Sequence, residues 1–382
     1  MLKKDAGLSV GFLYDDNLDS TDGVAQYVKT LGAWLSANGH NVTYLAGESK
    51  STSWGGGQVY SLSRNLKMAW GGNRLSISLL PRLEQIKKVI KENQFDIAHV
   101  QVPYSPFMAQ QVIKRLKSDT TVVGTFHIFP ANFVTVFGSK LLRLVYGKSF
   151  GRFDSFISVS TAAQAYAKTA FGADSVVVPN TVDLKKFSST QQPAANHIVF
   201  LGRLVKRKGA GELLKAFALL NRHNRQAYLT IAGEGPERKN LENFIKRHDL
   251  ADRVKLAGYI SEADKPKLLS SASVACFPSL YGESFGIVLI EAMAAGAGVV
   301  IGGHNAGYQS VLGAQPGLLF NPKDSAGLAE LLNRLLSDKK LAGKLHSWQQ
   351  AAVGQYDVAV VGGQLVDLYR QAIVKHQQKR HN

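Results

Sequence analysis

The stretch LSVGFLYDDNLDSTDGVAQYVKTLGAWLSANGHNVTYLAG, residues 8–47, contains an apolar run, a segment with helical periodicity and a second apolar run. In the middle segment, apolar side chains recur every three or four residues and predict a helix with one buried face: Val24, Val28, Leu31 and Leu35. Gly39 stands where a left-handed glycine commonly ends such a helix. An apolar run on either side of a helix predicts two parallel strands joined by a crossover.

The same alternation continues through both halves of the chain. The first half adds the apolar runs FDIAHV, TVVGTF, FDSFISVS and SVVVP, and the polar stretch at residues 180–197 is typical of a linker. A second series then begins with HIVFLG and ends with AGVVIGG. We therefore predict an α/β protein of two Rossmann-like domains with parallel sheets, at residues 1–187 and 188–361. A closing helix near residues 362–382 is expected to pack back on the first domain.

Length and composition agree with two globular domains and restrict the partners. The chain has 382 residues, and its one cysteine, Cys276, lies in an apolar run that predicts a buried strand. No secretion signal and no apolar stretch of about 20 residues is present, so we expect a cytoplasmic protein. Lys and Arg number 45 against 28 Asp and Glu, and this excess favours anionic partners. Seven of these basic residues lie within residues 64–91, beside the single acid Glu84.

The segment GESFGIVLIEAMAAG, residues 282–296, places two glutamates across a predicted strand-to-helix junction. Backbone N–H groups at the start of that helix are expected to bind a diphosphate: those of Ser284, Phe285, Gly286 and Ile287. Glu283 would then lie beside a sugar, and Glu291, two turns into the helix, would accept hydrogen bonds from ribose hydroxyls. The alternative is a buried helix whose acids only cap or pair.

A second basic segment, FLGRLVKRKG, follows the first strand of the second half. It places Gly202, Arg203 and Lys208 near the carboxyl end of that strand, where ligands of such sheets bind. Two fixed cations can stabilise the charge of a leaving nucleoside diphosphate without a metal. The alternative is a solvated basic turn.

These two segments, together with IAGEGPERKNLE and VPNTVD, resemble the retaining GT-B glycosyltransferases of the glycogen synthase-like superfamily, of the family 4 type. The N-terminal half, with DGVAQYVKTLGAWLSANGHNVTYLAGES and GTFHIF, is most similar to the phosphatidylinositol alpha-mannosyltransferases. The resemblance implies two Rossmann-like domains facing each other across a cleft, with donor contacts mainly in the second and acceptor contacts in the first. It implies sugar transfer with retention from a nucleotide diphosphate sugar, with GDP-mannose favoured, and without a protein nucleophile, metal or cofactor.

The resemblance also implies roles for individual residues. His127 in GTFH matches the family histidine that faces the donor sugar, and Arg203, Lys208, Glu283 and Glu291 match the diphosphate, sugar and ribose contacts. Where the family has a Gly-Gly pair, this chain has Asp22 and Gly23. Gly23 still permits close approach of a phosphate, whereas the Asp22 carboxylate is expected to alter acceptor contacts. The acidic loop that precedes them departs from a calcium loop at Ser20 and Gln26, so we predict no metal there.

The segment PRLEQIKKVIKEN predicts an amphipathic helix with Leu83, Ile86 and Ile90 on one face. Basic residues lie on its other faces and are expected to meet an anionic bilayer: Arg82, Lys87, Lys88 and Lys91. Further basic residues would extend this patch: Lys140, Arg143, Lys148 and Arg152. We therefore expect peripheral attachment to the inner face of the cell membrane and an anionic lipid acceptor such as phosphatidylinositol. A solvated helix face is the alternative.

Three other functions are weighed against this one. The same chemistry on a soluble acceptor, a polysaccharide or a sugar phosphate, stays open. A nucleic-acid-binding protein is disfavoured, because the sequence has no zinc pattern, helix-turn-helix signature or RRM-like aromatic motif, and no nucleic-acid partner is expected. A dinucleotide oxidoreductase is weaker still, because no GxGxxG opens either half. The oligomeric state is left open.

Overall fold

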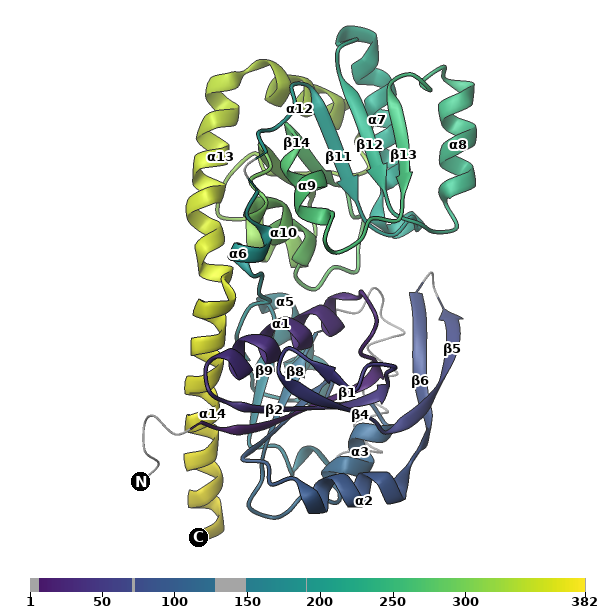
Figure 1. The fold of residues 1–382 in the computed structure, drawn as a ribbon. Coiled ribbons are helices and arrows are strands. Elements are labelled where there is room, and N and C mark those ends of the chain that lie inside the picture. Colours follow the sequence, from purple (N-terminus) through teal and green to yellow (C-terminus); the bar gives the residue numbers. More distant parts are fainter. Residues whose placement is uncertain (1–6, 71–72, 128–148, 190, 382) are drawn as a thin grey trace. The chain divides into compact units, whose positions relative to one another are not determined.

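The computed structural model describes residues 7–70, 73–127, 149–189 and 191–381. The chain forms two compact units, one of residues 1–181 with 358–382 and the other of residues 182–357 (Figure 1). Each unit contains its own parallel α/β sheet, as the alternation of apolar runs and helical segments predicts. The short helix α6 (Leu184–Phe187) lies within the predicted linker, next to the first crossing between the units.

The first unit is built on an eight-stranded sheet with the order β10-β9-β8-β7-β1-β2-β4-β3. Only the β3–β4 pair is antiparallel. The strands are β1 (Ser9–Asn17), β2 (Asn41–Glu48), β3 (Ser53–Trp54), β4 (Gly57–Ser61), β7 (Ile97–Gln101), β8 (Thr121–Phe126), β9 (Ser155–Ser158) and β10 (Val176–Val177). A separate antiparallel hairpin joins β5 (Ser63–Trp70) to β6 (Asn73–Pro81). The apolar pattern predicts neither this hairpin nor β3 and β4, which are short or rich in polar residues.

Helices cover both faces of this sheet. One apolar cluster is formed with α1 (Gly23–Ala37) and α14 (Val358–His381), and another with α2 (Leu83–Glu92) and α3 (Met108–Ile113). A further helix, α5 (Thr161–Tyr166), continues into one π-helical turn. Helix α1 has the predicted buried face, and Gly39 has the left-handed φ of 84° that was expected. Its N–H and that of the next residue donate to carbonyls of the last turn.

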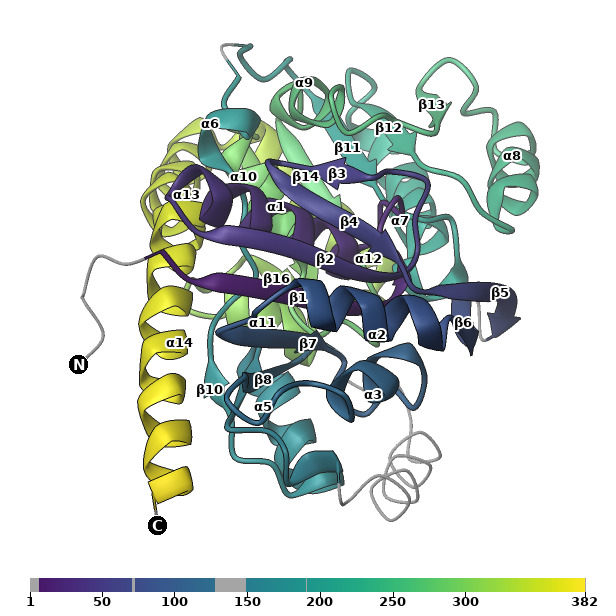
Figure 2. The ribbon, with the colours of Figure 1, turned by 60° about the horizontal axis from the view of Figure 1, so that its bottom comes forward.

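The C-terminal helix α14 packs on α1 and β8 within the first unit (Figures 1 and 2). The Tyr369 hydroxyl lies 2.7 Å from Nδ1 of the buried His99 on β7. At Gly362 an added Cβ would lie 2.4 Å from the Trp34 ring of α1, so only glycine permits this approach of the two helices. Near the end of α14, His376 lies 3.1 Å from a carboxylate oxygen of Asp154.

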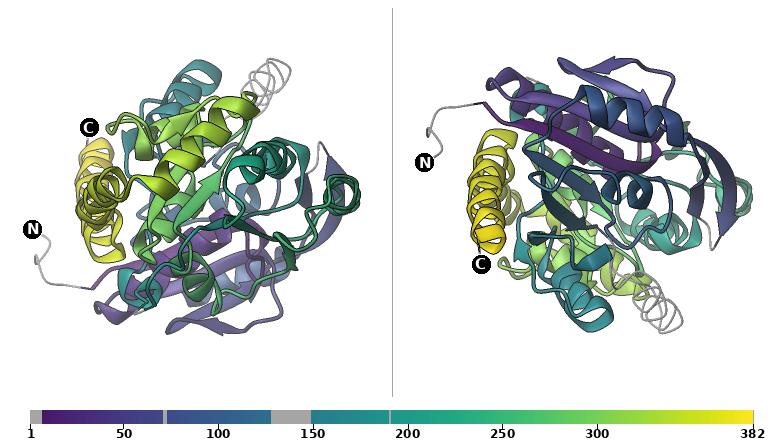
Figure 3. Two further views of the ribbon diagram at one scale, coloured as in Figure 1. Left: turned by 90° about the horizontal axis from the view of Figure 1, so that it is seen from above. Right: turned by 90° about the horizontal axis from the view of Figure 1, so that it is seen from below.

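The second unit contains a six-stranded, all-parallel sheet with the order β13-β12-β11-β14-β15-β16. Its strands are β11 (His197–Leu201), β12 (Tyr228–Ala232), β13 (Val254–Gly258), β14 (Val274–Phe277), β15 (Val299–Gly303) and β16 (Leu319–Phe320). Helices lie on both faces of the sheet (Figure 3): α7 (Ala210–His223), α8 (Arg238–Arg247), α9 (Lys265–Ser270), α10 (Ile287–Ala294), α11 (Ala306–Leu312), α12 (Ser325–Ser337) and α13 (Lys339–Val353). Cys276 is fully buried on β14, as predicted.

Both sheets reverse their strand order at a central strand. In the first unit the chain builds outward from β1 on one side and from β7 on the other. In the second unit it does the same from β11 and β14. In such sheets the loops at the carboxyl ends of the two central strands diverge and leave room for ligands. We therefore expect ligand-binding sites at the loops that follow β1, β7, β11 and β14.

Helix α2 departs from the expected face in one respect. Leu83 was predicted to share an apolar face with Ile86 and Ile90, but it is 40% exposed at the first residue of the helix. Val89 is buried in its place. Ile86, one turn further along, is fully buried, so only the first residue of the expected face is left in contact with solvent.

Candidate active site

In the second unit, the loops that follow β11 and β14 are in direct contact. Gly209 ends the first loop with φ 75°, and an added Cβ would lie 2.0 Å from the Pro278 carbonyl oxygen in the second. The Leu280 N–H donates to the Arg207 carbonyl at 2.8 Å. A third loop joins them, because a Cβ on Gly233 would lie 1.9 Å from the Gly202 carbonyl oxygen. Glycines therefore hold the three backbones close together at the carboxyl edge of the sheet.

Glu283 lies at the centre of this contact and is 9% exposed. Its Oε1 is 2.8 Å from Nζ of Lys208 and 3.0 Å from Nη1 of Arg207. The Ser279 hydroxyl donates to the same oxygen at 3.0 Å. Burial alone raises the pKa of Glu283, but Lys208 and then Arg207 outweigh burial, so the pKa lies below its usual value. Glu283 is therefore a carboxylate at neutral pH.

Helix α10 begins directly beyond this carboxylate. Gly286 precedes it with φ 105°, and no side chain caps the first turn within the described chain. The Tyr308 ring fills the space where a Cβ on Gly286 would lie, 2.6 Å away. Phe285 is buried, so it can offer a ligand only its backbone. These features leave the predicted N–H groups of α10 as the polar surface of this turn.

Glu291 lies inside α10 and is 7% exposed. Lys265 of α9 lies 3.3 Å from its Oε1 and 2.9 Å from Oε2 of Glu262. Burial raises the pKa of Glu291, and Lys265 only partly offsets this effect. The pKa of Lys265 is itself raised, because its two carboxylate neighbours outweigh the effect of burial. The second predicted glutamate is therefore part of a cluster of one lysine and two glutamates.

The structure brings some of the predicted site residues into contact and reveals two further residues that were not predicted. Lys208 and Glu283 form an ion pair, whereas Arg203 is exposed on the same loop. Arg207 and Lys265 were not predicted as site residues. Arg207 directly precedes Lys208 in sequence, and a rule that considered every cation of the loop would have found it. Lys265 and Glu291 are 26 residues apart, and no spacing rule connects them.

In the first unit, His127 follows β8 and is 6% exposed. Its Nε2 lies 2.7 Å from Oε1 of Gln101 at the end of β7, and its ring contacts the edge of Tyr27. Burial lowers the pKa of His127 to about 3. The ring is therefore neutral near pH 7, and it lies at the carboxyl end of its strand as the sequence predicts.

In the loop after β1, the Asp22 carboxylate occupies the start of helix α1. Asp22 caps α1 by accepting from the N–H groups of Val24 at 2.9 Å and Ala25 at 3.0 Å. The Tyr14 hydroxyl donates to its other oxygen at 3.0 Å. A phosphate approaching Gly23 would meet a helix start that Asp22 already neutralises. The departure from the Gly-Gly pair thus changes the electrostatics of this loop.

The predicted membrane-facing helix presents its lysines to solvent. Lys87, Lys88 and Lys91 are exposed; Lys87 lies 2.7 Å from Glu84, and Lys88 lies 3.9 Å from Glu92. Arg82 is also exposed and donates to the Ser61 carbonyl at 3.4 Å. Two leucines flank Arg82, Leu80 at 65% exposure and Leu83.

Arg152, which was expected to extend this basic patch, makes contacts within the first unit. It donates to the carbonyls of Lys117 and Thr120 and lies 3.8 Å from Asp154. Its guanidinium is therefore engaged within the first unit. The other three expected residues, Lys140, Arg143 and Lys148, lie outside the described residues.

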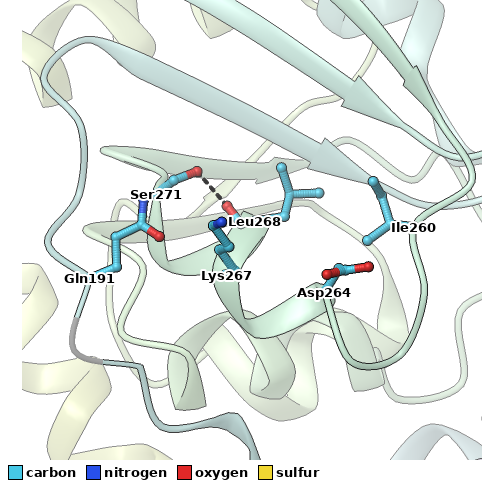
Figure 4. Close-up of a pocket in the computed structure, with 6 residues that line it drawn as sticks. All are labelled: Gln191, Ile260, Asp264, Lys267, Leu268 and Ser271. Atoms are coloured by element: carbon cyan, nitrogen blue, oxygen red, sulfur yellow. Dashed lines mark hydrogen bonds between the residues drawn. The ribbon is translucent and has the colours of Figure 1, made fainter.

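The described residues contain no group of three or more His, Cys, Asp or Glu side chains arranged to hold a metal ion. No helix among them is long and apolar enough to cross a membrane. A cavity of about 270 Å³ lies beside α9 (Figure 4), lined by Gln191, Ile260, Asp264, Lys267, Leu268 and Ser271. None of the predicted site residues lines it.

Two protein-family models match successive parts of the chain. Residues 21–186 match Glycosyltransferase Family 4, and residues 182–352 match Glycosyl transferases group 1. The phosphatidyl-myo-inositol mannosyltransferase of Mycolicibacterium smegmatis is 30% identical over 370 residues, which cover 95% of this chain and 93% of that protein. A glycogen synthase of Mycobacterium tuberculosis is 28% identical over 56% of this chain and 54% of its own length.

Solved structures share the fold at lower identity. Anabaena HepE in complex with UDP and glucose has a TM-score of 0.76 at 18% identity, over 94% of this chain and 99% of that chain. Sucrose-phosphate synthase of Thermosynechococcus elongatus has a TM-score of 0.69 at 21% identity, over 96% and 99%.

The two Rossmann-like units and the similar solved structures show the GT-B fold, and the matching family models show a glycosyltransferase. More particularly, the chain belongs to the group 1 and family 4 glycosyltransferases.

Proposed function

We propose that this glycosyltransferase moves mannose, with retention of anomeric configuration, from GDP-mannose to the inositol headgroup of phosphatidylinositol. The donor part of this proposal rests on one observation. Beside the uncapped start of α10 lies the group formed by Arg207, Lys208 and Glu283. Lys208 and a helix N-terminus suit a diphosphate, and the Glu283 carboxylate, which Arg207 holds in place, suits sugar hydroxyls. The names of the mannosyltransferases that match 95% of the chain support the acceptor.

In the proposed reaction the bond between the sugar C1 and the diphosphate oxygen breaks, and a bond from C1 to the acceptor oxygen forms on the same face. The acceptor proton passes to an oxygen of the leaving diphosphate, so no protein nucleophile is needed. Lys208 and Arg203 stabilise the charge that the diphosphate gains. Neutral His127 hydrogen-bonds the donor sugar, and Glu291 binds the ribose. The reaction uses no metal ion or cofactor.

The proposed acceptor also requires contact with a lipid surface. The exposed lysines of α2 offer positive charge, and the neighbouring Leu80 and Leu83 offer apolar side chains. Charge and apolar side chains together suit the headgroup boundary of an anionic bilayer. We therefore place the enzyme peripherally on the inner face of the cell membrane, with its acceptor in that bilayer.

A soluble acceptor is the second candidate. The glycogen synthase match over 56% of this chain favours it, because that enzyme's name implies a polysaccharide product. In that case the donor chemistry would be unchanged and α2 would be a solvated helix.

The test is sugar transfer from a panel of GDP- and UDP-sugars, with vesicles of phosphatidylinositol or of phosphatidylglycerol. Transfer of mannose to phosphatidylinositol alone, with an α-linkage by NMR and an unchanged rate in EDTA, is the expected result. Glu283→Gln should abolish transfer, whereas Glu330→Gln, at an exposed position of α12, should not. Equal transfer to glycogen or to a sugar phosphate without vesicles would favour the second candidate. Inverted product or a requirement for metal would overturn the mechanism.

A further inference from the structure

The side chains that contact Glu283 in the second unit all act on one of its two oxygens. Oε1 lies 2.8 Å from the Lys208 ammonium and 3.0 Å from both the Arg207 guanidinium and the Ser279 hydroxyl. Oε2 receives no hydrogen bond from the described residues and is not fully buried. The last torsion of a glutamate has a broad, roughly two-fold profile, so only such donors distinguish the two oxygens.

The direction of the hydrogen bonds behind Oε1 follows from the groups themselves. Glu283 is ionised, so its oxygen only accepts, and the single hydroxyl proton of Ser279 is donated to it. The Tyr308 hydroxyl lies 3.1 Å from the Ser279 hydroxyl and must therefore be the donor in that pair. Burial, and then the nearby charge of Glu283, raise the pKa of Tyr308, so the phenol keeps its proton. The donors thus run in one direction, from Tyr308 through Ser279 to Glu283.

The Tyr308 ring is fixed by close packing of α11 against the loop of Glu283. Tyr308 is 1% exposed, and its ring fills the space where a Cβ on Gly286 or Gly302 would lie, 2.6 Å and 2.7 Å away. A Cβ on the preceding Gly307 would lie 2.4 Å from the Glu283 carbonyl oxygen, so the two backbones are in contact. The ring therefore cannot shift without moving the start of α10.

The start of α11 is also bonded to the loop that contains Ser279. Asn305 caps the helix by accepting from the Tyr308 N–H at 3.0 Å. Its side-chain N–H groups donate to the Gly303 carbonyl at 2.9 Å and to the Ser279 carbonyl at 3.3 Å. Ser279, which is 1% exposed, is thus held through its backbone as well as its hydroxyl. Both hydroxyls have one fixed geometry, as a residue that orients a reactive group requires.

We propose that Tyr308 and Ser279 are positioning residues that hold Oε1 of Glu283 and so direct Oε2 toward the donor sugar. The inference rests on the proposed function, since it names the carboxylate oxygen that such an enzyme offers to its donor. Tyr308 acts on Glu283 through Ser279, so its hydroxyl should have no effect on the carboxylate once Ser279 is replaced.

The first measurement follows the Glu283 carboxyl directly. In protein labelled with ¹³C at the glutamate carboxyl, its NMR signal is the one that Glu283→Gln lacks. Ser279→Ala should move its titration midpoint to higher pH, because the charged form loses a donor. Tyr308→Phe removes only a hydroxyl and should move the midpoint in the same direction by less. Adding Tyr308→Phe to Ser279→Ala should cause no further shift.

Sugar-transfer kinetics then test the role in the reaction. Ser279→Ala should lower kcat about tenfold and Tyr308→Phe about threefold, since a hydrogen bond to a charged group is lost or weakened. The affinity for GDP should stay at the wild-type value, and the double variant should have the kcat of Ser279→Ala. Urea unfolding checks the fold. Ser279→Ala leaves the Tyr308 hydroxyl without its acceptor and should lose stability, part of which the double variant regains.

Matched controls lie at the amino edge of the same sheet. Ser273 precedes β14 and donates to the Ala194 carbonyl, and Tyr228 begins β12. Ser273→Ala and Tyr228→Phe should match wild type in the Glu283 titration and in kcat.

The outcomes separate this inference from the proposed function. If Glu283 titrates identically in wild type, Ser279→Ala and Tyr308→Phe, or if both variants keep the wild-type kcat, the inference is wrong even when transfer proceeds. Losses of kcat that multiply in the double variant would also overturn it, because Tyr308 would then act independently of Ser279. If the titration shifts occur as expected and wild type transfers no mannose to phosphatidylinositol, the proposed function fails and the positioning of Glu283 stands.

Discussion

At the scale of single residues, Arg207 is the side chain whose role the sequence did not indicate. It contributes one of the two cations that keep Glu283 ionised, and its own Nε is buried without a hydrogen-bond partner among the described residues. An arginine that has one guanidinium nitrogen on a buried carboxylate and another without a hydrogen-bond partner among the described residues is suited to hold that carboxylate in place. We regard Arg207 as a positioning residue for Glu283.

Replacing Arg207 with methionine should leave Glu283 paired with Lys208 alone. Because a nearby opposite charge lowers a carboxylate pKa, the acid limb of the kcat profile should move to higher pH. Arg207→Lys should restore most of the wild-type profile. The measurement is sugar transfer between pH 4 and 8. A loss of rate that is equal at every pH would show that Arg207 does not control the ionisation of Glu283.

Asp15, near the end of β1, gives a prediction about stability and pH. It accepts from the Ser105 hydroxyl and from the Ala109 N–H at 2.6 Å, yet burial raises its pKa from 3.8 to about 6. Between these two values the folded chain keeps a proton that the unfolded chain has lost, so this group lowers the free energy of unfolding as pH rises. Two pH units at about 1.4 kcal/mol each give a cost of roughly 3 kcal/mol above pH 6.

Asp15→Asn removes that proton equilibrium. Urea unfolding should show the variant gaining stability relative to wild type, by roughly 3 kcal/mol, between pH 4 and pH 7. Any lost hydrogen bond would shift the whole curve equally and leave this slope intact. Asp174→Asn, at an exposed carboxylate paired with Lys168, is the control and should follow wild type. A constant difference between Asp15→Asn and wild type would contradict the raised pKa.

At the scale of elements, α2 joins the first unit by one face and presents lysines on the other. Because each basic residue near an anionic surface contributes about 1 kcal/mol, replacing Lys87, Lys88 and Lys91 with glutamine should weaken binding to phosphatidylinositol vesicles on the order of 100-fold. The three are exposed, so the fold should be unaffected. Vesicle co-sedimentation at low salt measures the effect.

The matched control removes the same charge from another helix. Lys239, Lys246 and Arg247 on α8 are also exposed, and their replacement with glutamine lowers the net charge equally. If both triple variants lose the same affinity, the vesicles sense only the total charge of the chain, and α2 has no special role. In 0.5 M salt the difference between the two should largely disappear, because screening shortens the range of these charges.

At the scale of the whole molecule, the first unit is completed by the last segment of the chain. Helix α14 contributes Val361, Leu365 and Tyr369 to the apolar cluster that also contains α1. A chain that ends at Asp357 should therefore lose protection from hydrogen exchange across the first unit, while the second unit, residues 182–357, stays protected. Protection retained in β1 and β7 would show that the sheet folds without α14.

A shorter truncation separates the apolar and polar contributions of α14. Ending the chain at Val374 keeps the apolar contacts and removes His376, which lies 3.1 Å from the buried Asp154 and 2.8 Å from the Ser118 carbonyl. The same truncation removes Lys379, which lies 3.5 Å from Asp154, so this buried carboxylate loses both of its partners on α14. Leaving a buried acceptor short of a partner costs about 1–3 kcal/mol. This chain should fold with correspondingly lower resistance to urea, rather than lose the unit.

Much of the fold was predictable because its signals are local. The alternation of apolar runs with segments such as residues 23–37 depends only on which neighbours in sequence are apolar. It predicts two parallel α/β sheets and the placement of Glu283 before a helix and Glu291 inside it. It does not predict β3 and β4, which are short and pair at the edge of the large sheet, or β5 and β6, which are rich in polar residues and pair only with each other.

The sequence by itself therefore determined the fold class, the family and the residue types of the candidate donor site. Only the tertiary structure decided how those residues combine: Arg207 and Glu283 are 76 residues apart, and Lys265 reaches Glu291 from a different helix. It also placed Trp54 over Lys29 and showed that Asp22 caps its own helix. The physical reason is that side-chain pairing depends on distance in space, which separation along the chain does not encode, whereas hydrophobic periodicity is written into consecutive residues.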